Sequence, residues 1–227
     1  MKQISGKKQT AACLIAAAIL CCGIMAVVDG VLMPGYAVKS ICKIVLFMLA
    51  PLGLSFLCRD VQFREIFRFQ KSGILLPLLL GGGVFGVILA AYAIFRNVFD
   101  FSGIAASLSQ NVGVSRENFM FVALYISFAN SLLEEFFFRG FLFVNLKESL
   151  SRRWAYLISA FAFAMYHVAM MIGWFSFLPF FLCMIGLAAG GMIFAYMNEK
   201  QGSVYASWLV HMCANFAINT IGFLLMK

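Results

Sequence analysis

Two histidines and a pair of adjacent glutamates are the residues of this sequence best suited to acid–base chemistry. His167 and His211 are the only histidines in the chain, and Glu134 and Glu135 interrupt an otherwise apolar stretch. A carboxylate and an imidazole can each accept a proton from water, which prepares the water to attack a carbonyl group. These residue types therefore indicate a hydrolytic site.

The spacing of the charged residues suggests which of them pair. Glu135 and Arg139 are spaced i, i+4 with the acid on the N-terminal side, the favoured order for an ion pair on a helix. Glu134 points about 100° away around the same helix, so it stays available for another task. Asn215 follows His211 at i+4 and places an amide donor on the same helical face, where it could stabilise an oxyanion.

The composition shows where these residues must be held. The 227-residue chain is 63% hydrophobic and 11% charged, and its mean hydropathy is strongly positive, unlike a water-soluble domain of this size. It predicts an all-α, polytopic transmembrane helical bundle with about seven spans, an eighth being left open. Each span needs roughly 20 apolar residues. The expected spans are 10–28, 40–57, 73–95, 118–145, 154–173, 175–197 and 203–225.

The positive charge is distributed in a way that suits a membrane protein. The net charge of +8 is divided among short clusters between the apolar segments, so we expect the lipid bilayer as a partner and no nucleic acid. The positive-inside rule places the N-terminus in the cytoplasm. The first span continues without a cleavage site and is expected to be retained. No linker is visible, so residues 1–227 are expected to form a single membrane domain.

Three of the spans carry their polar groups to a similar depth. Glu134, His167 and His211 lie 13, 14 and 11 residues, respectively, from the nearest lysine or arginine on the cytoplasmic side. At about 1.5 Å per residue these separations correspond to roughly 16–21 Å. A charge at the centre of a bilayer costs at least ~2.5 kcal/mol and is rarely kept without a partner or a task. We therefore expect one shared site within the membrane.

At these residues the sequence resembles the CAAX protease and bacteriocin-processing (CPBP, or Abi) family of intramembrane proteases, related to the Ras-converting CAAX endoprotease. The family motifs E-E-x-x-x-R, F-x-x-x-H and H-x-x-x-N read here EEFFFR at 134–139, FAMYH at 163–167 and HMCAN at 211–215. The resemblance covers roughly residues 118–220, the expected catalytic core. Residues 1–115 match nothing specific in the family.

The resemblance implies an intramembrane endopeptidase that hydrolyses a peptide bond in a peptide or a membrane-associated protein. Glu134 would activate the attacking water and His167 would assist it. His211 and Asn215 would hold the oxyanion of the tetrahedral intermediate. We expect a bacterial source, in which peptide pheromones, leader peptides and bacteriocins are the natural substrates.

The resemblance leaves the cofactor open between none and a divalent metal such as zinc. Family members are commonly labelled metalloproteases, and a bound metal would have Glu134, His167 and His211 as its ligands. However, H-E-x-x-H is absent, and the related CAAX endoproteases are described with a glutamate-activated water and no obligatory metal. The seven cysteines include no C-x-x-C pair, which disfavours a thiolate zinc cluster. In either case Glu135 and Arg139 would support the site.

Two other functions are compatible with the same residues. A non-catalytic bacteriocin-immunity or regulatory membrane protein could use the scaffold without any hydrolysis. A proton-coupled carrier could use Glu134 and the two histidines as a relay, as membrane carboxylates often do. Carriers commonly contain internal repeats, and none is visible between the halves of this chain.

Overall fold

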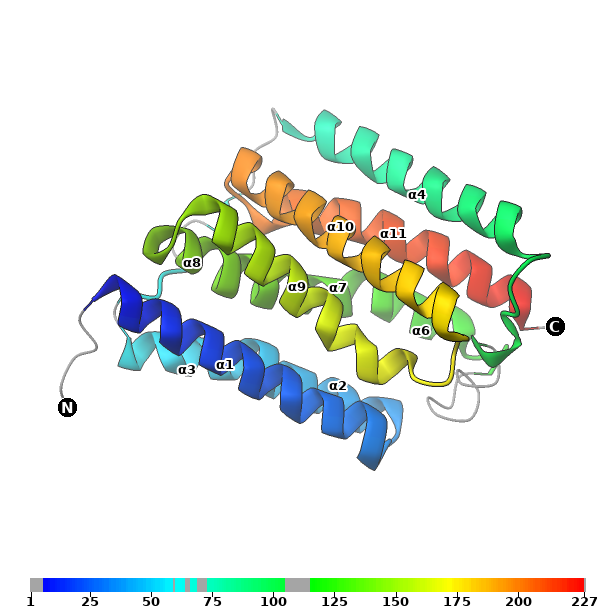
Figure 1. Ribbon diagram of the computed structural model, residues 1–227, viewed down its shortest axis with the longest axis horizontal. Helices are drawn as coiled ribbons and strands as arrows, with labels where there is room; N and C mark the ends of the chain where they lie inside the picture. Colours follow the sequence, from blue (N-terminus) through cyan, green and yellow to red (C-terminus); the bar gives the residue numbers. More distant parts are fainter. Residues whose placement is uncertain (1–5, 59, 64–65, 69–72, 105–114, 227) are drawn as a thin grey trace.

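Every regular element in the described part of the chain is a helix. The computed structural model describes residues 6–58, 60–63, 66–68, 73–104 and 115–226. Within these residues, seven helical segments are long and apolar enough to span a membrane, which confirms the predicted all-α transmembrane bundle. The long helices run side by side along one common direction (Figure 1). The cytoplasmic N-terminus, the bacterial source and the single-domain boundaries stay predictions.

The spans follow one another in chain order, and three of them contain π-helical turns, which are marked η. The first comprises α1 (Lys7–Val27) and η1 (Val28–Leu32), the second α2 (Tyr36–Ile44), η2 (Val45–Leu49) and α3 (Ala50–Leu57), and the third α4 (Leu75–Phe95). The fourth comprises α6 (Phe119–Tyr125), η4 (Ile126–Asn130), α7 (Ser131–Glu135), η5 (Phe136–Phe143) and α8 (Val144–Ser149). The last three are α9 (Arg152–Met171), α10 (Phe177–Gln201) and α11 (Val204–Leu225).

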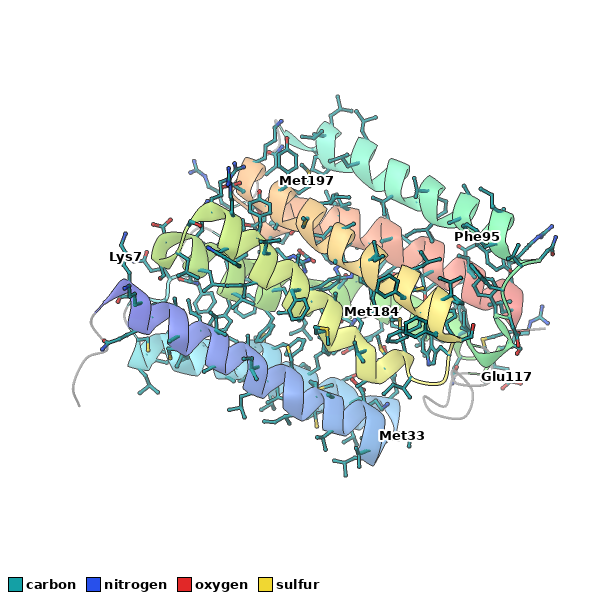
Figure 2. All side chains as sticks on the ribbon, viewed as in Figure 1. Lys7, Met33, Phe95, Glu117, Met184 and Met197 are labelled. Carbon is teal, nitrogen blue, oxygen red and sulfur yellow. The ribbon has the colours of Figure 1, made fainter. Side chains whose placement is uncertain are left out.

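The fourth span lies at the centre of the bundle. It contacts α9 and α1 through η5 and α8, η2 of the second span through α7 and η5, and α11 through α7. α4 packs against α11 and forms one edge, while α1 to α3 form the opposite edge (Figure 1). Figure 2 shows the side chains on this framework, with Lys7 and Met33 labelled at opposite ends of the first span. All eight residues of η5 are buried, so the glutamate–arginine motif lies in the interior.

Aromatic ring contacts hold the second span against η5 of the fourth span. Phe47 of η2 is fully buried and stacks on Phe137, with ring centroids 4.3 Å apart and an interplanar angle of 11°. It also meets Phe138 and Tyr166 edge to face, at 5.6 and 5.1 Å. Such pairs are worth about 0.5–1.5 kcal/mol each beyond the area they bury. The cluster therefore fixes η2 against both η5 and α9.

The interface between α9 and α10 depends on one small residue. A Cβ atom added at Gly191 would lie 3.0 Å from the Ala160 Cα atom and 3.1 Å from its Cβ atom, whereas a Cβ atom at Gly186 would meet nothing within 4 Å. Small residues allow such close helix approach in membranes. Because overpacking typically costs about 1–3 kcal/mol, we expect Gly191→Val to lower the thermal midpoint in detergent. Gly186→Val, on the same helix, is the matched control, and equal midpoints for the two variants would contradict this interpretation.

Candidate active site

The structure brings Glu134, His167 and His211 together from three different helices. Glu134 lies on α7, His167 on α9 and His211 on α11. The Glu134 Oε2 atom lies 3.9 Å from His167 Nε2 and 3.7 Å from His211 Nε2. Glu134 is only 2% exposed. The expected convergence at one depth is therefore present, and both imidazoles present the same type of nitrogen to the same carboxylate oxygen.

The opposite nitrogen of each imidazole is held by an acceptor. His167 Nδ1 lies 2.8 Å from the Phe163 carbonyl oxygen, and His211 Nδ1 lies 2.9 Å from Glu135 Oε1. A carbonyl and a carboxylate can only accept, so each Nδ1 carries the proton. In the neutral imidazoles, both Nε2 atoms therefore present a lone pair toward Glu134 Oε2. Three acceptors face one another, and a water molecule placed among them could donate its two protons to two of them.

Glu135 and Arg139 form the ion pair that their spacing predicts. Arg139 Nη1 lies 3.0 Å from Glu135 Oε1, and both side chains are fully buried. The Arg139 guanidinium carbon lies 4.3 Å from the centroid of the Phe163 ring, and Nη2 donates to the Gly191 carbonyl oxygen at 3.3 Å. Because Glu135 Oε1 also accepts from His211 Nδ1, the pair fixes the orientation of that histidine.

A lysine and an asparagine complete the surroundings of Glu134, and the sequence-based prediction missed both. Lys43 Nζ donates to Glu134 Oε1 at 3.1 Å and to Asn130 Oδ1 at 2.6 Å, and Asn130 Nδ2 donates to Glu134 Oε1 at 3.0 Å. The predicted second span, 40–57, placed Lys43 at its edge, whereas the helix begins at Tyr36. An ionisable residue inside a span is the signal that could have identified it.

Asn215 lies on α11 with its side chain directed at the fourth span. Its Nδ2 atom donates to the carbonyl oxygen of Ile126, in the π-helical segment η4, at 3.2 Å. Asn219, one turn further on, donates to the carbonyl oxygen of Ala123 at 3.3 Å. The amide nitrogen of Asn215 has a second proton to donate. Its role in an oxyanion site stays a prediction.

The chain is similar to a known family over the segment that carries these motifs. Residues 116–217 match the family described as type II CAAX prenyl endopeptidase Rce1-like. This segment contains all three motifs, so over these residues the chain is similar to the Rce1-like family. The match confirms the predicted resemblance and supports a CAAX endopeptidase-type function in a multi-pass membrane protein. No curated protein and no solved structure is significantly similar to the chain.

The residues of this site include metal-ligand types, but their arrangement does not fit a metal ion. Glu134, His167 and His211 are the kinds of ligand found in catalytic zinc sites. However, Glu134 Oε1 already accepts from Lys43 and Asn130, and the lysine cation beside it would repel a divalent cation. Within the described part of the chain, no group of three or more histidine, cysteine, aspartate or glutamate residues is placed to hold a metal.

Proposed function

We propose that this Rce1-like protein is an intramembrane endopeptidase in which Glu134 activates a water molecule for attack on a peptide bond. The observation that carries the proposal is the convergence of Glu134 Oε2 with the Nε2 atoms of His167 and His211. Each gap is too long for a direct hydrogen bond and suits a bridging water. Burial among apolar helices strengthens every electrostatic interaction in such a site.

In the proposed reaction, Glu134 Oε2 accepts a proton from the water as the water oxygen bonds to the carbonyl carbon. His167 Nε2 accepts a hydrogen bond from the second proton of the water and so orients the water. The tetrahedral intermediate then collapses, and the proton held by Glu134 passes to the leaving amine nitrogen. The C–N bond breaks to give one new carboxyl group and one new amine. A positioned acid–base group of this kind typically contributes about 10²–10⁴-fold to the rate.

The negative charge that develops on the carbonyl oxygen needs donors. Asn215 supplies the amide proton that is not bonded to Ile126. His211 can donate from Nε2 only when both of its nitrogens are protonated. Glu135 beside Nδ1 stabilises that imidazolium, and Arg139 in turn balances Glu135. Preorganised donors of this kind are usually the largest single contribution to such catalysis.

Cleavage of defined peptides by the purified protein in lipid vesicles tests the proposal. The probes are an internally quenched peptide that ends in a CAAX sequence with a farnesylated cysteine, its unprenylated counterpart, and a mixed peptide library. We expect cleavage of at least one probe. In ¹⁸O-labelled water the label should enter the new carboxyl group, as mass spectrometry would detect. Cleavage of none of the three probes would contradict the proposal.

We expect hydrolysis to continue when metals are removed. The Lys43 ammonium lies 3.1 Å from Glu134 Oε1 and disfavours a second cation at this carboxylate, so we expect Glu134 and His167 to activate the water without a metal. The measurement is the initial rate with and without EDTA or a phenanthroline chelator, followed by addition of zinc. A loss of activity that zinc restores would overturn this expectation.

A further inference from the structure

Lys43 belongs to the part of the chain that lies outside the Rce1-like segment, yet it touches the central carboxylate of the site. Its side chain is buried, and its ammonium group lies 3.1 Å from Glu134 Oε1. We propose that Lys43 is a positioning residue of the active site, which holds Oε1 of Glu134 so that Oε2 is the oxygen presented to the water. The inference rests on the proposed function and extends the active site into the second span.

The contacts of Glu134 distinguish its two oxygens. Oε1 accepts from Lys43 Nζ at 3.1 Å and from Asn130 Nδ2 at 3.0 Å, whereas Oε2 is the oxygen that faces the two imidazoles. Lys43 also donates to Asn130 Oδ1 at 2.6 Å, so the three side chains form a closed triangle. A glutamate side chain can otherwise adopt several rotamers. The triangle selects the one in which Oε2 points to His167 and His211.

The framework around Lys43 keeps its ammonium group in place. Phe47 follows Lys43 at i+4, within η2, and is stacked on Phe137 of η5. The ammonium nitrogen lies 5.0 Å from the centroid of the Tyr166 ring, directly before His167 in the chain. π-Helical turns such as η2 occur often at functional sites. A lysine side chain loses conformational entropy when it is ordered, and these contacts offset that loss and maintain one orientation.

Charge balance also requires a cation at this position. Arg139 is already paired with Glu135, and an imidazole, unlike a lysine, carries no permanent positive charge. Without Lys43, the buried Glu134 carboxylate would have no permanent cation among its described contacts. A purely structural cation would affect folding alone. A positioning residue must also affect the rate of the chemical step.

The same helix offers a matched control. Lys39 lies one turn before Lys43 on α2 and pairs with Asp29 Oδ1 at 3.4 Å, and none of its recorded contacts is with Glu134. Both lysines are largely buried, with side-chain exposures of 13% and 11%. Replacing each with methionine removes one ammonium group from the same helix. Only Lys43→Met changes the surroundings of Glu134.

The test compares the steady-state kinetics of Lys43→Met, Lys39→Met and Lys43→Arg on the peptide that the wild-type protein cleaves. Displacement of a catalytic group by about 1 Å can cost about 100-fold in rate, so we expect kcat to fall by about that factor in Lys43→Met with KM nearly unchanged. Lys39→Met should keep kcat within about threefold. Lys43→Arg, which keeps the charge and the donors, should recover most of the loss.

A second substitution guards against a Lys43→Met protein that does not fold. Asn130→Ala removes the bridging amide but keeps both members of the ion pair, and we expect it to lower kcat by about tenfold with an unchanged thermal midpoint. The inference is overturned if folded Lys43→Met or Asn130→Ala keeps the wild-type kcat, or if only KM changes, while Glu134→Gln is inactive. A wild-type protein that cleaves no probe overturns the proposed function and this inference with it.

Discussion

Glu134→Gln is expected to lower kcat by about 10²–10⁴-fold, the contribution of a general base. The glutamine carbonyl can still accept from Lys43 and Asn130 as Oε1 does. Its amide group can donate toward the lone pairs of His167 and His211, which face Oε2. An amide cannot take a proton from water. The substitution therefore preserves the hydrogen bonds of the site and removes the chemistry.

The measurement is the rate of peptide cleavage, with the thermal midpoint in detergent as the control for folding. Gly186→Val provides a reference for an ordinary substitution on a surface without close neighbours. A folded Glu134→Gln protein with turnover within about tenfold of wild type would exclude Glu134 as the general base. Biological activity that survives this substitution would favour the non-catalytic immunity or regulatory alternative.

Arg139→Met is expected to have the largest effect on stability, lowering the free energy of unfolding by about 3–5 kcal/mol. Arg139 is fully buried, and its removal leaves the Glu135 carboxylate buried without a cation. Loss of the guanidinium also removes its contacts with the Phe163 and Phe194 rings, at 4.3 and 4.9 Å. Unfolding in mixed micelles with increasing SDS would measure the change.

Arg152→Met is the matched control for this prediction. Arg152 also pairs with a carboxylate, since its Nη2 atom lies 2.8 Å from Glu199 Oε2, but its side chain is 66% exposed. Exposed ion pairs contribute about 0–1 kcal/mol because water and salt screen them. An Arg139→Met protein no less stable than Arg152→Met would show that the buried pair does not support the site. Adding Glu135→Gln should restore part of the loss, because the unpaired charge is then removed.

Much of the architecture could be predicted from the sequence, because each membrane span is a continuous run of mostly apolar residues. The expected fifth span, 154–173, corresponds to Arg152–Met171, and the seventh, 203–225, to Val204–Leu225. The fourth was predicted to end at 145 but continues to Ser149. Asn145 explains the difference, because its Nδ2 atom donates to the carbonyl oxygen of Phe141 at 2.8 Å within the same helix. A polar residue that is satisfied locally does not end a span.

The sequence could not predict the π-helical turns. Segments η4 and η5 surround the glutamates, and η2 follows Lys43. A π-turn changes the direction of the side chains that follow it, and no residue pattern comparable to a capping motif identifies it. The direction of Asn215 toward the carbonyl of Ile126 in η4, for example, depends on where that turn occurs.

The sequence by itself determined the features that depend on local geometry. Helical spacing alone pairs Glu135 with Arg139, and the apolar runs alone bring Glu134, His167 and His211 to a common depth. Only the tertiary structure decided that Lys43 meets Glu134, because 91 residues separate them and no local rule relates them. The covalent chain sets distances along a helix, whereas the choice of neighbours between helices depends on how their buried side chains fit together.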